Sequence, residues 1–167
     1  LERIQTELTQ QARLTAQLIK ENQHVAQLMI NAFEARQQSG TDDALMPIRD
    51  QLQQIILPYW TYLQQRGVRQ LHFHLAPHAF TFYSARKPES HGDISSEIRP
   101  LVMEVLNSAQ PQSGLEVSRS GLGLSAVVPL SNAGKVIAAI EVGYGLTDIL
   151  KLTEDAMLHA DNSAVGV

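Results

Sequence analysis

The spacing of apolar residues changes once along the chain, near Gly67, and this change constrains the fold more than any other feature. Before Gly67, apolar residues recur every three or four positions, which is typical of amphipathic helices. After it, stretches such as VRQLHFHLA (68–76) alternate, which is typical of half-buried strands. A chain of 167 residues is long enough to form one domain with a real core. The sequence therefore predicts an α+β domain whose long helices come first.

Residues 1–40 are predicted to form one long helix, because Ile4, Leu8 and Phe33 belong to a helical apolar pattern without proline. At about 1.5 Å per residue such a helix is about 60 Å long, too long for this domain to bury alone. We expect its early turns to project, to pair with a second copy in a homodimer, or to continue toward a membrane. A second helix is predicted over 43–66, with a kink or interruption at Pro58.

The remainder of the chain is predicted to form an antiparallel five-stranded sheet with helices covering a face. Capping residues at Asp93 or Ser95 predict where the helix between the second and third strands begins. An amphipathic helix is expected to follow the last strand and to lead out of the domain. The predicted strands are 68–76, 79–85, 113–120, 121–130 and 135–145, and the predicted helices are 93–108 and 146–161.

Composition excludes several classes of protein. The formal net charge is −4 and there are no basic runs, so nucleic acid is not an expected partner. The absence of cysteine excludes disulfides, thiol nucleophiles and cysteine-ligated zinc. No stretch approaches the eighteen or so apolar residues of a membrane helix. The chain starts without Met and within a helix, so we expect it to be part of a longer protein with flanking segments.

Four of the six histidines lie within residues 71–93. His72 and His74 are two apart on a predicted strand, so they point to the same face, and His78 and His91 follow in the turn and loop. These histidines could form an open zinc or copper site from His72, His74 and His78. Alternatively, His74 could line a polar pocket, or the histidines could simply form the polar face of the strand. No carboxylate stands beside them at ligand spacing.

No motif indicates an enzyme or a cofactor. The serines lack the G-x-S-x-G context of a hydrolase nucleophile. SRSGLG (118–123) lies between two strands and not before a helix, so it lacks the dipole that favours phosphate. The carboxylates Asp93, Glu116 and Glu141 show no pairing typical of general acid–base catalysis.

Basic residues in the sheet half instead favour a binding pocket. A guanidinium beside aromatic side chains is a common way to recognise a small carboxylate. Such cations stand at Arg86, Lys87, Arg99 and Arg119, and aromatic walls could come from Phe80, Phe82, Tyr83 and Tyr144.

Ordered fragments of this half resemble the single Cache sensor domains of bacteria. These fragments are LHFHLAP, RKPE, GDISSEIR, GLEVSR, VVPL and IEVG, and the resemblance covers about residues 71–145. It implies a PAS-like antiparallel sheet on a long N-terminal helix, located outside the inner membrane in a chemoreceptor, a histidine kinase or a cyclic-di-GMP enzyme. Members often bind short carboxylates such as acetate, propionate or pyruvate.

The resemblance suggests three parts: a membrane-proximal or dimerisation helix (1–40), a sensor domain (41–145) and an exit helix toward a transmembrane segment (146–167). One departure is Ser84, which stands where members often have an arginine, so Arg86 could take over the carboxylate. We expect no catalysis, and two alternatives remain open: a metal-responsive sensor, or a dimerisation module without ligand. The expected pocket residues are His74 as hydrogen-bond donor, Phe82 and Tyr144 as apolar walls, and Ser84, Arg86, Lys87 and Arg119.

Overall fold

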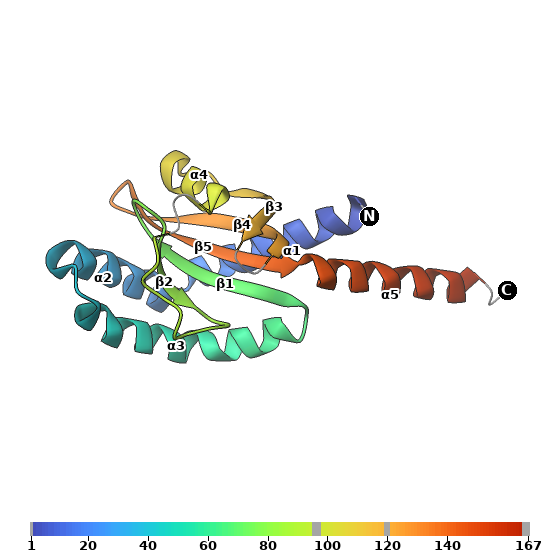
Figure 1. Cartoon of the computed structure of the whole chain (residues 1–167), viewed down its shortest axis with the longest axis horizontal. Helices are drawn as coiled ribbons and strands as arrows, with labels where there is room; N and C mark the ends of the chain where they lie inside the picture. The colour runs from blue at the N-terminus through green and yellow to red at the C-terminus, as the bar shows by residue number, and fades with distance from the viewer. Residues whose placement is uncertain (1, 95–97, 119–120, 165–167) are drawn as a thin grey trace.

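The computed structural model describes residues 2–94, 98–118 and 121–164. Its elements follow the predicted order: long helices, two strands, a helix, three strands and a last helix (Figure 1). The α+β fold class is therefore confirmed. The helices are α1 (Glu2–Glu21), α2 (Gln23–Ser39), α3 (Asp42–Gln64), α4 (Pro100–Ser108) and α5 (Leu146–Ala164). The strands are β1 (Val68–Leu75), β2 (Phe80–Ser84), β3 (Gln112–Ser118), β4 (Gly121–Asn132) and β5 (Lys135–Gly145).

The five strands form one antiparallel sheet in the order β2-β1-β5-β4-β3. Successive hairpins join β3, β4 and β5, whereas the connection that contains α4 crosses from one edge strand, β2, to the other, β3. This arrangement is the predicted PAS-like sheet. It places β1 beside the central strand β5, which is buried along most of its length, whereas β1 is buried mainly on its core face.

Helices cover the two faces of the sheet unequally. The first three helices pack on one face and α4 packs on the other (Figure 1). Strand β1 follows the predicted alternation: Leu71, Phe73 and Leu75 are fully buried in the core, and His72 and His74 point to the face that α4 covers only in part. The uneven cover leaves room for a pocket beside α4.

The first forty residues form two helices and not the single predicted one. The break lies at Asn22, whose backbone is extended (φ −64°, ψ 115°). Its side-chain Oδ1 accepts hydrogen bonds from the backbone N–H groups of His24 (3.0 Å) and Val25 (3.2 Å). Asparagine is a strong N-cap residue, so it starts α2 inside a continuous apolar pattern.

Two predicted helix boundaries also differ from the structure. Helix α3 continues through Pro58 to Gln64, so the helix is not interrupted there. The helix predicted from Asp93 or Ser95 begins only at Pro100, and Ser95 lies outside the described residues. Asp93 is not helical because its backbone pairs with β2: Thr81 N–H donates to the Asp93 carbonyl at 2.8 Å.

Strand β2 contains a register shift opposite Phe73 and His74. Tyr83 pairs with Phe73 and Thr81 pairs with His74, so Phe82 is the additional residue between these two pairs. Such a bulge changes the face to which the following side chains point. The Phe82 ring lies 5.2 Å from the guanidinium of Arg49 on α3, on the core side of the sheet.

Helix α5 continues directly from β5 and extends away from the sheet (Figure 1). Ile149 is its only buried residue up to position 161, and residues 154–161 are all exposed. No helix in the described ranges combines the length and apolarity that crossing a membrane requires.

Candidate ligand-binding site

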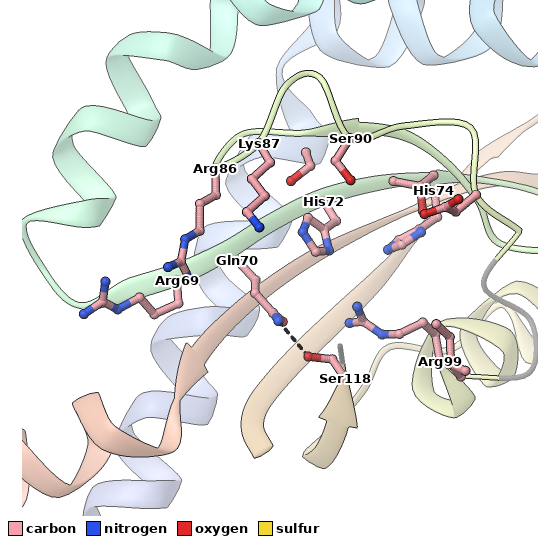
Figure 2. A pocket seen from close by; sticks show the side chains of 13 residues that line it. Arg69, Gln70, His72, His74, Arg86, Lys87, Ser90, Arg99 and Ser118 are labelled. Atoms are coloured by element: carbon pink, nitrogen blue, oxygen red, sulfur yellow. Dashed lines mark hydrogen bonds between the residues drawn. The ribbon is translucent and has the colours of Figure 1, made fainter. Parts of the chain in front are cut away.

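A pocket of about 420 Å³ lies on the α4 face of the sheet, between β1, the segment that follows β2 and the start of α4 (Figure 2). Its volume is within the range of small-molecule sites. Ile98 is the one apolar side chain among its described lining residues, so the pocket suits a small polar molecule. The lining residues are Arg69, Gln70, His72, His74, Thr81, Ser84, Arg86, Lys87, Ser90, Asp93, Ile98, Arg99 and Ser118.

Four of the seven residues expected at the pocket line it: His74, Ser84, Arg86 and Lys87. They come from β1, from the end of β2 and from the segment after it. Arg119, a fifth expected residue, lies outside the described residues.

The other two expected residues, Phe82 and Tyr144, lie away from this pocket in the core. The bulge in β2 turns Phe82 toward α3, where its carbonyl accepts a hydrogen bond from Arg49 Nε at 2.7 Å. Tyr144 alternates with Gly143 along β5, so it points to the face opposite the pocket. Burial raises the pKa of Tyr144, as expected for a phenol in the core. The predicted aromatic walls are therefore not supplied by these two residues.

Sequence reasoning missed several lining residues. Gln70 could have been found, because it shares the alternation of His72 and His74 along β1. Arg69 could not have been found in this way, because strand alternation places it on the opposite face from Gln70. It lies at a register shift between β1 and β5, and its side chain lines the pocket. Arg99 was recognised as a cation of the sheet half but was not assigned to the pocket, since its position depends on where α4 begins.

The cations of the pocket differ in whether they are paired. Arg69 makes a two-pronged ion pair with Asp148 on α5, with both N–O distances 2.7 Å. The hydrogen bond from Arg69 lowers the pKa of Asp148, and the same contact raises the pKa of Arg69. Arg86 and Lys87 are exposed, and among the described residues no side-chain hydrogen bond or ion pair holds either cationic group. These two side chains are the ones available to an anion.

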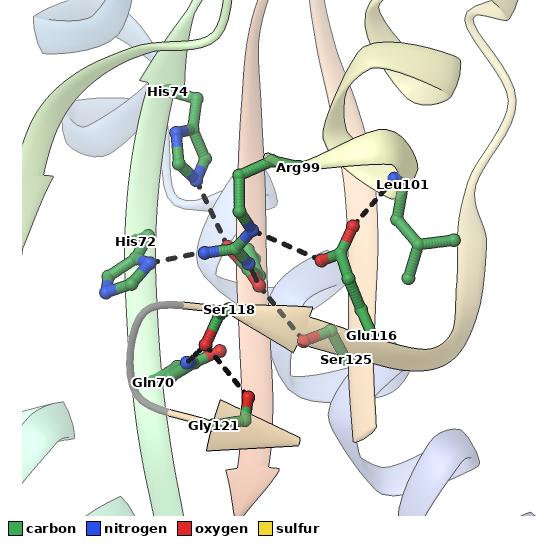
Figure 3. A network of polar contacts seen from close by, with 10 residues as sticks. Gln70, His72, His74, Arg99, Leu101, Glu116, Ser118, Gly121 and Ser125 are labelled. Carbon is green, nitrogen blue, oxygen red and sulfur yellow. Dashed lines mark hydrogen bonds and ion pairs between the residues drawn. The ribbon is translucent and has the colours of Figure 1, made fainter. Parts of the chain in front are cut away.

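Arg99, at the start of α4, lies between two buried carboxylates (Figure 3). Its Nε donates to Glu116 Oε2 on β3 at 3.2 Å, and its terminal nitrogen forms an ion pair with Glu141 Oε1 on β5. Glu116 Oε1 also accepts the Leu101 N–H, at 3.0 Å. Burial lowers the pKa of Arg99, while Glu116 opposes this effect. The network fixes the start of α4 to two strands of the sheet.

The two β1 histidines meet the same carboxylate. His74 Nε2 lies 3.1 Å and His72 Nδ1 lies 3.4 Å from Glu141 Oε2. Burial lowers the pKa of His72 to about 3, helped by the charge of Arg99. Burial also lowers the pKa of His74 well below its usual value, with smaller contributions from His72 and Arg99. Both imidazoles are therefore neutral near pH 7.

The carboxylate beside the histidines corrects the sequence interpretation, which found none at ligand spacing. Glu141 lies 67 residues from His74 but is the direct partner of His72 in the β1–β5 register. Conversely, His78 lies in the exposed turn between β1 and β2 and is not among the grouped side chains. The cluster that the structure contains is thus His72, His74 and Glu141.

Gly143 makes room beside this cluster. A Cβ atom on Gly143 would lie 2.9 Å from Gln70 Oε1 and 3.1 Å from Ser125 Oγ. Ser125 Oγ donates to Glu141 Oε1 at 3.0 Å, so a side chain at position 143 would disturb the group that orients Glu141. The glycine in the sequence VGYG therefore has a packing role at the site.

Comparisons with solved structures identify similar folds. The sensor domain of the V. cholerae histidine kinase DctB matches with a TM-score of 0.60 and 16% identity, over 89% of this chain and 54% of that one. The sensor domain of E. coli DcuS matches with a TM-score of 0.60 and 9% identity, over 91% of this chain and 98% of that one. The extracellular domain of the putative histidine kinase vpHK1S-Z8 matches with a TM-score of 0.53 and 12% identity, over 90% and 56%.

These likenesses concern the fold, and the chain spans about half the length of the DctB sensor domain. Comparison with curated protein sequences gives no significant match. A family model described as "double sensory domain of two-component sensor kinase" matches residues 1–167. The predicted resemblance to Cache sensor domains, drawn over residues 71–145, is thereby confirmed, and the family model extends the match to the whole chain and describes a double rather than a single sensory domain. This chain belongs to the dCache_3 family of sensory domains.

Proposed function

We propose that this sensory domain is the extracytoplasmic, periplasmic part of a bacterial transmembrane receptor and that it binds a small carboxylate without chemical conversion. The observation that carries the proposal is the pair of unpartnered cations, Arg86 and Lys87, beside a pocket of about 420 Å³. The other described cations of the pocket, Arg69 and Arg99, already face carboxylates. An anion would therefore be held mainly by Arg86 and Lys87.

The polarity of the pocket favours a short acid. An arginine can grip a carboxylate through two parallel hydrogen bonds, and a lysine adds a point charge. Ser84, buried at the end of β2, offers a hydroxyl in place of the arginine common in similar domains. All the described lining residues except Ile98 carry a polar or charged group, and the volume of about 420 Å³ suits a short acid.

A route for the signal runs from the pocket into α5. Arg69 lines the pocket and binds Asp148 in the first turn of α5, and the charge of Arg86 also lowers the pKa of Asp148. A bound anion would attract both arginines and so compete with Asp148. A ligand shifts a two-state equilibrium only through its different affinity for the two states, and this competition provides such a difference.

The arrangement of the outer helices supports a membrane-anchored homodimer. The start of α1 and the whole of α5 project from the same end of the domain (Figure 1), as two helices leading to one membrane would. Leu14 and Leu18, one turn apart on α1, are 60% and 59% exposed. We propose that α1 pairs with α1 of a second copy through this apolar face.

Calorimetric titration of the metal-free domain with a panel of short carboxylates tests the binding proposal. At least one acid should bind with 1:1 stoichiometry. Arg86→Ala should weaken its affinity about a hundredfold, the effect of losing a charged hydrogen-bonded pair. Arg13→Ala, which removes an exposed arginine on α1, is the matched control and should bind as the unmodified domain does.

Hydrogen exchange on the same samples tests the route. The bound acid should change amide protection in the first turns of α5, near Asp148, and leave the turn between β4 and β5 unchanged. Absence of binding by every acid in the panel, or equal binding by Arg86→Ala, would contradict the proposed ligand class. Binding without any change in α5 would contradict the route alone.

A further inference from the structure

We propose that His72, His74 and Glu141 form a binding site for a divalent transition metal of the zinc type at the base of the pocket. The two imidazoles line the pocket and the carboxylate lies beneath them, fully buried. One ligand atom from each residue lies within 4.8 Å of the others. This site is separate from the cations proposed to hold a carboxylate, and it does not depend on them.

The distances suit a tetrahedral ion. Two ligand atoms about 2.1 Å from a tetrahedral zinc ion are about 3.4 Å apart. The Glu141 Oε2 atom lies 3.1 Å from His74 Nε2 and 3.4 Å from His72 Nδ1. Both nitrogens thus lie near one carboxylate oxygen at a separation compatible with shared coordination, and the three ligand atoms all lie within 4.8 Å of one another.

The charges of the network also favour a cation. Two buried carboxylates, Glu116 and Glu141, share the guanidinium of Arg99. One guanidinium matches only one of these two carboxylate charges, and an unmatched charge in the protein interior is costly. A divalent cation would compensate this charge, and neutral imidazole is the form of histidine that coordinates metal.

The supporting contacts resemble those of protein metal sites. Metal-bound carboxylates are usually held by hydrogen bonds from a second layer of residues. Here Ser125 and Arg99 both bind Glu141 Oε1, which leaves Oε2 directed at the histidines (Figure 3). Three protein ligands leave a fourth coordination position, and because His72 and His74 line the pocket, this position would face its interior.

The donor set selects the class of metal. Two imidazole nitrogens and one carboxylate oxygen suit Zn²⁺, Cu²⁺, Ni²⁺ or Co²⁺ and disfavour Mg²⁺ and Ca²⁺, which prefer oxygen ligands alone. The site differs from the trio predicted from the sequence, because Glu141 replaces His78 as the third ligand. His78 therefore provides a matched control within the same segment of the chain.

Titration of the chelator-treated domain with ZnCl₂ alone tests the site, with Co²⁺ as a spectroscopic substitute. The unmodified domain should bind one zinc ion, and its Co²⁺ complex should show the intense visible absorption of tetrahedral cobalt. His72→Gln should weaken zinc binding by at least about a hundredfold, since even the loss of a supporting contact costs ten- to a hundredfold. His78→Gln should bind zinc as the unmodified domain does.

Circular dichroism should show that His72→Gln is folded, because 18% of the His72 side chain is exposed and glutamine is polar and of similar size. Glu141→Gln, which keeps the shape of the side chain, provides a second test with the same expected loss. The proposal is overturned if the unmodified domain does not bind zinc with 1:1 stoichiometry, or if folded His72→Gln binds as tightly as His78→Gln. Carboxylate titrations in chelator are unaffected by either outcome, so the two proposals fail independently.

Discussion

His72 illustrates how one residue couples the site to pH. Its pKa is about 3 in the folded domain, whereas an exposed histidine titrates near 6.5. Between these values the unfolded chain binds a proton that the folded domain does not. The free energy of unfolding therefore retains the contribution of His72 above about pH 6.5 and loses it progressively as the pH falls toward 3. His74, whose pKa is also lowered, acts in the same direction.

Replacing His72 should flatten this pH dependence. In His72→Gln, urea unfolding between pH 6 and pH 4 should show a slope smaller by up to about 1.4 kcal/mol per pH unit, the value for one proton. His78→Gln is the control, because an exposed ring is hydrated whether or not the chain is folded. The measurements are made in chelator so that metal does not contribute. An unchanged slope in His72→Gln would show that the buried imidazole is protonated together with the unfolded one.

The residues of the site differ in how far the sequence could predict them. Ser84 ends β2, Arg86 and Lys87 follow it, and His74 belongs to the alternating face of β1, so local pattern was enough to select side chains that line one pocket. Which residues of β5 lie beside His72 and His74 depends on the register between β1 and β5, and local sequence patterns do not determine that register. Glu141 was therefore read as an isolated carboxylate, although it is the group that both histidines contact.

Asn22 separates α1 from α2. Its contribution to the free energy of unfolding can be compared with that of Thr41, an N-cap residue without a capping hydrogen bond. Asn22→Ala removes the side-chain acceptor of two backbone N–H groups and should lower the free energy of unfolding by about 1 kcal/mol. Thr41 occupies the same N-cap position before α3 but makes no capping hydrogen bond with its side chain. Thr41→Ala should therefore change the stability much less.

Chemical denaturation of the two variants checks this prediction at the level of the helices. A loss in Asn22→Ala no larger than that in Thr41→Ala would mean that the break before α2 is imposed by packing and not by the cap. Packing is the alternative cause of the break, because Val25 and Met29 in the first turns of α2 are fully buried. The comparison separates the two causes without changing the core.

Helices and strands could be predicted where a regular spacing of apolar residues ended at clear turn residues. Strands β1 and β3–β5 match their predicted positions because alternation and turn residues agree there. The break at Asn22 was hidden because the apolar pattern continues through it. The late start of α4 at Pro100 arises from the pairing of residues 92–94 with β2, a tertiary contact that overrides local capping signals. The bulge in β2 is likewise a feature of strand pairing, and it turns the Phe82 side chain to the core side and not to the pocket side.

At the scale of the whole molecule, several large apolar side chains are exposed on the first and last helices. Helix α5 exposes Leu150, Met157 and Leu158 beyond its one buried residue, and α1 exposes Leu14 and Leu18. Soluble domains rarely leave such rows of large apolar side chains on helices that project from the body. A second copy, paired along α1, would cover the α1 residues and place both pockets outward from a shared helical stalk.

Sedimentation of the isolated domain over a range of concentrations tests this assembly. The unmodified domain should approach a dimer as its concentration rises. The double substitution Leu14→Glu and Leu18→Glu should raise the dissociation constant by about a hundredfold or more, since burying a leucine stabilises by about 1.5–3 kcal/mol. Leu57→Glu is the control because Leu57 is similarly exposed, at 55%, but lies on α3. A monomer at every concentration would remove α1 as the dimer interface, and dimers weakened equally by Leu57→Glu would move that interface to the α3 side.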